Sequence, residues 1–156
     1  MATGLEPGDA PATYGRRVAQ RLGLPRIFKS GRGSEVAVHE ALHAGLPRRA
    51  LLRAMPPGVP VSVLLPVFGI SLRTLMRLKT DPSKLLDAEQ SGRVWRFTEL
   101  LAKAEDVFGS VERAVTWMLE PAMALENRRP IELLTTAVGA RLVDDVIERM
   151  RHGVYQ

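Results

Sequence analysis

The sequence predicts an all-α protein, and three observations support this prediction. Apolar residues recur every three or four positions along most of the chain, as in helices that bury one face. Aromatic residues, which are enriched in strands, make up only 5% of the 156 residues. The one short alternating stretch, residues 59–63, is broken by Pro60 and closely followed by Pro66. Because 46% of the residues are hydrophobic, the chain can bury a core, and we expect one continuous helical body.

The first third of the chain is expected to contain a tail and two short helices. Residues 1–33 are rich in glycine and proline and predict a flexible N-terminal tail, with a short helix near residues 16–22. Helices are predicted over residues 35–44, where Ser34 is suited to the N-cap position, and over residues 48–55.

The first of these helices contains a motif that is typical of zinc hydrolases. His39 and His43 are four residues apart and share a face, so they could hold zinc with Glu40 as the general base. A third ligand is required, and the extended zinc-protease pattern has glycine and histidine where this chain has Leu46 and Arg49. We therefore expect two surface histidines and no bound metal.

Residues 61–80 predict a helix-turn-helix, in which a short helix, a glycine turn and a second helix pack across each other. Gly69 supplies the turn, Ser71 is suited to cap the second helix, and Asp81-Pro82 ends it. With Gly69 at the turn, every position that faces the core is apolar: Leu64, Phe68, Ile70, Leu75 and Leu78.

The second helix of this pair carries the candidate DNA-binding residues. The polar residues of this set are Ser71, Arg73, Thr74, Arg77 and Lys79. Two features leave a different role open. Pro66 removes a hydrogen bond inside the first helix and should kink it. Leu72 and Met76 lie on the face that would enter the DNA groove, where they suit either a thymine methyl group or a dimer interface.

The second half of the chain predicts four more helices. A long helix over residues 86–108 should join the two halves without a linker, although Gly92 within it costs about 1 kcal/mol relative to alanine. Three further helices follow, and their start signals are Ser110, Pro130 and Thr136.

The last helix is expected to carry an apolar face and to lead into a short tip. Its apolar residues, which recur at helical spacing, are Val138, Leu142, Val143, Val146, Ile147 and Met150. Gly153 stands where a helix commonly ends. Val154, Tyr155 and Gln156 are too few to form another element, so we expect an ordered helix with a short tip attached.

Charge and composition limit the classes of function. Residues 1–104 hold 16 Lys and Arg against 8 Asp and Glu, whereas residues 105–156 hold 6 against 9. The basic part can meet nucleic acid and the acidic part should not, although a solvated arginine-rich surface explains the same numbers. The chain has no long apolar run, no signal-peptide core in residues 1–15 and no cysteine, so we expect a cytoplasmic protein without a membrane span or disulfides.

Four short motifs follow one another in the second half. They are Ala104-x-x-Val107-Phe108-Gly109, Ala114-x-x-Trp117-Met118-Leu119-x-Pro121, Pro130-x-x-Leu133-Leu134-x-Thr136-x-x-Gly139 and Gly153-Val154-Tyr155. In this order they resemble the toxin-binding domain of the Xre/MbcA/ParS antitoxins. The chain has Asn127 where the family is expected to have glycine in a turn. Asparagine tolerates a left-handed backbone, so the turn should survive.

The resemblance implies an organisation and three kinds of partner. A flexible tail over residues 1–33 would be followed by an Xre-like helix-turn-helix region over residues 34–103 and a toxin-binding domain over residues 104–156. The implied partners are a RES-domain toxin that consumes NAD⁺, operator DNA, and a second copy of the chain or a larger complex with the toxin. The implied toxin-binding residues are Trp117, Leu133, Arg151, His152, Gly153, Val154, Tyr155 and Gln156, of which the last six would cover the toxin's substrate cleft.

The sequence contains no nucleophile paired with a base, so we expect neither catalysis nor a cofactor. One alternative stays open, a stand-alone helix-turn-helix regulator without a toxin partner. A neighbouring reading frame of toxin size would favour the antitoxin.

Overall fold

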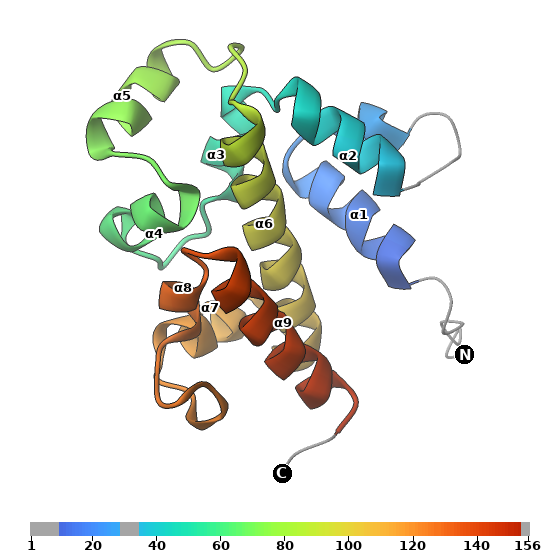
Figure 1. Cartoon of the computed structure of the whole chain (residues 1–156), viewed down its shortest axis with the longest axis vertical. Helices are drawn as coiled ribbons and strands as arrows, with labels where there is room; N and C mark the ends of the chain where they lie inside the picture. The colour runs from blue at the N-terminus through green and yellow to red at the C-terminus, as the bar shows by residue number, and fades with distance from the viewer. Residues whose placement is uncertain (1–9, 29–34, 154–156) are drawn as a thin grey trace.

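The computed structural model describes residues 10–28 and 35–153, and within them every regular element is helical, which confirms the predicted all-α class. The elements in chain order are α1 (Ala10–Arg21), η1 (Pro25–Phe28), α2 (Glu35–Ala44), α3 (Arg48–Ala54), α4 (Val61–Phe68), α5 (Leu72–Thr80), α6 (Ala88–Phe108), α7 (Val111–Leu119), η2 (Met123–Leu125), α8 (Pro130–Leu133) and α9 (Ala137–Arg151) (Figure 1).

The long helix α6 is the central element, and helices from both halves pack against it (Figure 1). A capping box fixes its start: Gln90 N–H donates to Asp87 Oδ1 at 2.7 Å, and Asp87 N–H donates to Gln90 Oε1 at 3.3 Å. It ends at Gly109, which has a left-handed backbone. Its buried apolar residues are Val94, Trp95, Phe97, Leu100, Leu101, Ala102 and Ala104. The predicted continuous body is therefore confirmed.

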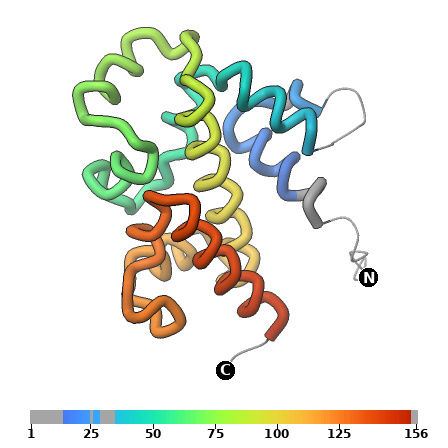
Figure 2. The backbone as a smooth tube through the Cα atoms, viewed as in Figure 1, coloured from blue at the N-terminus to red at the C-terminus, as the bar shows by residue number. Residues whose placement is uncertain are grey.

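The helices α4 and α5 form the predicted helix-turn-helix on one side of α6, opposite α1 and α2 (Figure 2). They meet at 87°, and Gly69 between them has a φ of 67°. Ser71 caps α5 by accepting a hydrogen bond from Thr74 N–H at 3.1 Å. The predicted core residues Leu64, Phe68, Leu75 and Leu78 are buried, and Ile70 is half-buried. No single helix in the described chain is long and apolar enough to cross a membrane, and only the bent pair α4–α5 passes by length and composition.

The three predicted helix starts in the C-terminal part are confirmed. Ser110 and Thr136 each accept a hydrogen bond from the backbone N–H three residues further on, at 3.2 and 3.0 Å. Pro130 is the first residue of α8, where its missing N–H costs nothing. In the turn before it, Asn127 has a φ of 59°, so asparagine supplies the left-handed backbone as expected.

The N-terminal region contains the short helix predicted near residues 16–22 as part of α1, which begins earlier than predicted, at Ala10. Within residues 1–33, α1 and η1 are ordered helices, and α1 packs on α6. The buried residues Tyr14, Val18 and Leu22 are four positions apart and form one apolar face. The glycine and proline residues around this short face obscure it in the sequence, and burial against α6 stabilises it. The rest of the predicted tail and the Ser34 cap lie outside the described residues.

Candidate functional site

The exposed face of α5 carries the DNA-binding candidates. Arg73, Arg77 and Lys79 are exposed, and none of them forms an ion pair within the part of the chain that the structure describes. Ser71 and Thr74 belong to the helix cap, with their hydroxyl oxygens 3.0 Å apart. Cations without an ion pair in the described chain are well suited to phosphate oxygens, so Arg73, Arg77 and Lys79 have the accessibility that DNA contact requires.

Two apolar residues share this outer part of α5. Leu72 and Met76 are 58% and 56% exposed and lie one helical turn apart, as predicted. Their exposure fits both the thymine methyl group and the dimer interface that the sequence leaves open.

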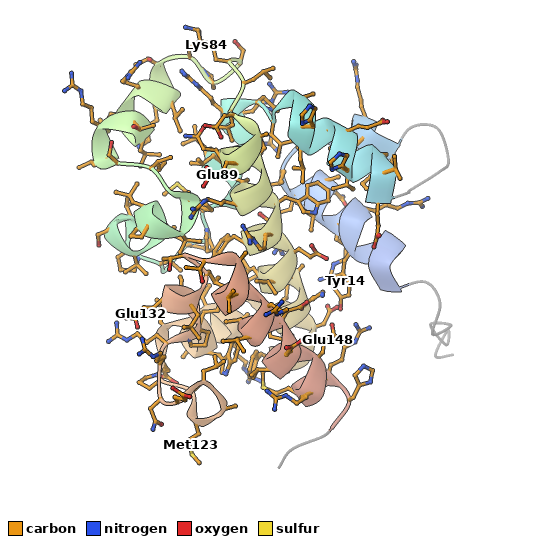
Figure 3. The ribbon with its side chains drawn as sticks, in the orientation of Figure 1. Tyr14, Lys84, Glu89, Met123, Glu132 and Glu148 are labelled. Atoms are coloured by element: carbon orange, nitrogen blue, oxygen red, sulfur yellow. The ribbon has the colours of Figure 1, made fainter. Side chains whose placement is uncertain are left out.

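Another basic residue, Arg49, lies at the same end of the molecule. Arg49 N–H donates to Pro82 O at 3.0 Å, and Arg48 N–H donates to Lys84 O at 2.7 Å, so α3 begins against the loop that follows α5. Arg49 and Lys84 are exposed, and Lys84 marks this end in Figure 3. The residues are far apart in the sequence, so no local pattern indicates that they meet.

The outer face of α9 carries two of the apolar residues named from the sequence. Val138 and Leu142 are 59% and 46% exposed. The buried face of α9 is narrower than the set of its apolar residues and includes Val143, Val146 and Ile147. The same exposed face continues through charged residues toward the last turn of the helix: Arg141, Asp145, Arg149 and His152.

The predicted toxin-binding residues Trp117 and Leu133 are half-buried. The Trp117 ring lies 5.3 Å from the ring of Phe108, centroid to centroid, so it contributes to packing between α6 and α7. Both residues therefore help to hold the C-terminal helices together, and only part of each side chain is accessible to a partner.

Of the predicted tip residues, the structure describes Arg151, His152 and Gly153, which lie in and directly after the last turn of α9. Arg151 and His152 both lie near Glu148, at 4.0 and 3.6 Å, and Gly153 has a left-handed backbone with a φ of 68°. The guanidinium carbon of Arg151 is 5.4 Å from the centroid of the Tyr14 ring, which is a contact with α1 that the sequence does not suggest. Val154–Gln156 lie outside the described residues.

The candidate zinc histidines are exposed on α2. The rings of His39 and His43 are stacked with their centroids 6.2 Å apart. Among residues 10–28 and 35–153, no group of three or more His, Cys, Asp or Glu side chains is arranged to hold a metal ion.

The fold and these surfaces define a helix-turn-helix protein with a helical binding domain built on a shared central helix. Residues 37–99 match the antitoxin Xre-like helix-turn-helix domain, and residues 103–153 match the antitoxin Xre/MbcA/ParS C-terminal toxin-binding domain. The chain is 33% identical over 154 residues to Antitoxin Xre of Yersinia enterocolitica, covering 93% of this chain and 95% of the relative, and it belongs to the Xre antitoxin family. Antitoxin Xre of Pseudomonas putida is 27% identical over 143 residues, covering 90% of this chain and 84% of the relative.

Proposed function

We propose that this antitoxin neutralises a RES-domain toxin that consumes NAD⁺, by docking the outer face of α9 on the toxin and covering its substrate cleft with Val154–Gln156. The observation that supports this most is the exposed apolar pair Val138 and Leu142. It lies within the segment that matches a toxin-binding domain, on the helix that leads into the tip. In this mechanism the chain is a binding protein that acts in the cytoplasm without catalysis.

Physical chemistry supports a two-part interaction of this kind. Burying an exposed Leu or Val side chain against a partner contributes about 1–2 kcal/mol. The half-buried Trp117 and Leu133 would add the accessible parts of their side chains to the contact. A short tip on an ordered helix loses little conformational entropy when it binds. Most of the free energy of its contacts therefore contributes to affinity.

Changing Leu142 to Asp tests the docking surface. We expect at least about a tenfold loss of toxin affinity, because the variant loses apolar burial and places an unpaired carboxylate in the interface. The measurement is co-purification and calorimetry with the product of the adjacent toxin-sized reading frame. Leu85→Asp is the matched control, since Leu85 is 59% exposed and lies between α5 and α6. Equal binding by both variants would contradict docking through α9, and failure to find any toxin partner would favour the stand-alone regulator.

We further propose that α5 represses the antitoxin's own operon as part of a dimer. The support is the matching helix-turn-helix region, the exposed Arg73, Arg77 and Lys79, and the basic residues Arg49 and Lys84 at the same end. The exposed apolar residues Leu72 and Met76 on α5 would then either contact thymine methyl groups or form the interface between two copies.

Replacing Arg73 and Arg77 together with Ala should weaken operator binding and reduce its salt dependence. Each phosphate contact releases counterions, so the slope of log K against log salt should fall by about 2. Fluorescence anisotropy with labelled operator DNA at several salt concentrations measures this slope. The control replaces Arg128 and Arg129, which are exposed in the C-terminal part and change the net charge equally. An unchanged slope in the α5 variant would place the DNA-binding face elsewhere and leave α5 to dimerisation.

A further inference from the structure

The side chain of Tyr14 is an unusual feature of the α1–α6 contact. It is only 4% exposed, although α1 is a short helix at the edge of the fold. Three cations approach its ring: Arg17 at 5.3 Å, Lys103 at 5.9 Å and Arg151 at 5.4 Å from the ring centroid. Cations within about 6 Å of an aromatic centroid are attracted by the ring quadrupole. These cations come from α1, α6 and α9, so the ring is a junction of three helices.

A hydrogen-bond network fixes the orientation of this ring. The Tyr14 hydroxyl donates to the Asp106 carboxylate. Arg17 donates to both oxygens of the same carboxylate, at 2.8 and 2.7 Å. Burial, together with the hydrogen bond to Asp106, raises the pKa of Tyr14 to about 12, so the hydroxyl remains a protonated donor at neutral pH. The ring face therefore has a defined position before any partner binds.

Arg151 is the residue through which this junction reaches the C-terminal end of α9. It is the last residue of α9 and stands two positions before Gly153. Its only ion pair within the described residues is a long one, 4.0 Å to Glu148, and Lys103 lies nearer to that carboxylate at 3.6 Å. Figure 3 shows Tyr14 and Glu148 near the same end of α6. The Tyr14 ring is thus a principal contact of Arg151 and joins the last turn of α9 to α1.

We propose that α1 positions the last turn of α9, with Tyr14 and Arg151 as the positioning residues that hold this turn against the N-terminal helix. For its effect on the toxin, this inference rests on the proposed function. The physical consequence is pre-organisation: a partner that binds at the end of α9 meets a helix turn that is already ordered, so less conformational entropy is lost on binding. Without the ring, the Arg151 guanidinium would keep the long ion pair to Glu148 as its one ion pair among the described residues.

The first experiment needs no toxin. The chain has no cysteine, so His152→Cys provides a single site for a nitroxide spin label at the exposed end of α9. We expect faster label motion in Tyr14→Leu and in Arg151→Gln than in the parent, and no additional increase when the two changes are combined. Val18→Ala is the control, because Val18 is a fully buried α1 residue and is not a partner in this junction. Unchanged label motion in Tyr14→Leu, or equal changes in Val18→Ala, would overturn the proposal.

The second experiment measures toxin inhibition with the unlabelled full chain. Tyr14→Leu should weaken inhibition about fivefold, which corresponds to about 1 kcal/mol, the usual strength of a cation–π contact. Tyr14→Phe keeps the ring and should recover most of the loss, which a purely structural role of the hydroxyl network would not predict. If the label responds as expected but deleting Val154–Gln156 leaves inhibition intact, the positioning role stands and inhibition by the tip is wrong.

Discussion

Changing Tyr155 to Ala is expected to weaken toxin binding by about 2 kcal/mol or more, roughly thirtyfold in affinity. A tyrosine offers a large rigid surface with one polar end, so it concentrates binding energy when a cleft buries it. The proposed NAD⁺-consuming activity of the toxin should return even where a weaker complex persists through the outer face of α9. The melting temperature of the free antitoxin should hardly change, because the core residues of the described chain all precede Val154–Gln156.

A titration of toxin activity with four forms of the antitoxin separates these effects. The forms are the unmodified chain, Tyr155→Ala, Tyr155→Phe and a truncation that lacks Val154–Gln156. The phenylalanine variant keeps the ring and should inhibit almost as well as the unmodified chain, whereas the truncation should inhibit least. Equal inhibition by all four forms would exclude occlusion by the tip and leave α9 as the inhibitory surface.

Changing Gly139 to Ala should reduce the free energy of unfolding by about 3 kcal/mol or more. A Cβ at this position would lie 1.9 Å from the carbonyl oxygen of Leu133 and 2.8 Å from its carbonyl carbon, so backbone would have to move. Gly139 N–H also donates to the Thr136 cap at 3.0 Å, and the displacement would disturb the start of α9. The melting temperature should fall by roughly 10 °C, and toxin binding should weaken with it.

The second glycine that is suited to this test lies in α6. Gly92 is helical, and a Cβ there would meet no atom within 4 Å. Gly92→Ala should therefore stabilise the protein by about 1 kcal/mol, the difference in helix propensity. Thermal denaturation of both variants, followed by circular dichroism, measures the contrast. If Gly139→Ala were as stable as Gly92→Ala, the close approach of α8 to α9 would be wrong.

Local chemistry explains why so much of the fold can be predicted from the sequence. The caps at Ser71, Ser110 and Thr136 and the left-handed backbone at Gly69 and Asn127 depend on each residue and its immediate neighbours. These signals are complete in a short window of the chain. Helix starts, turns and the buried face of α5 therefore follow from local sequence alone.

The parts that the sequence does not predict depend on partners far away along the chain. The sequence indicates a short helix near residues 16–22, but its packing against α6 depends on residues about 80 positions further along the chain. Val138 and Leu142 have the same helical spacing as core residues, and periodicity cannot distinguish a face that meets the core from one that meets a partner. The contact between Tyr14 and Arg151 joins the two ends of the chain, so no local pattern contains it.

The unbroken course of α6 has a consequence for how toxin level and repression are linked. Its 21 residues span about 32 Å and belong to both halves of the molecule. A ligand affects a distant site by favouring one of two arrangements, and a single helix shared by both halves leaves little room for a second arrangement. Toxin bound to one copy should therefore change the affinity of that copy for DNA only slightly. If the proposed repression holds, coupling between toxin binding and DNA binding would arise between neighbouring copies on an operator and not within one copy.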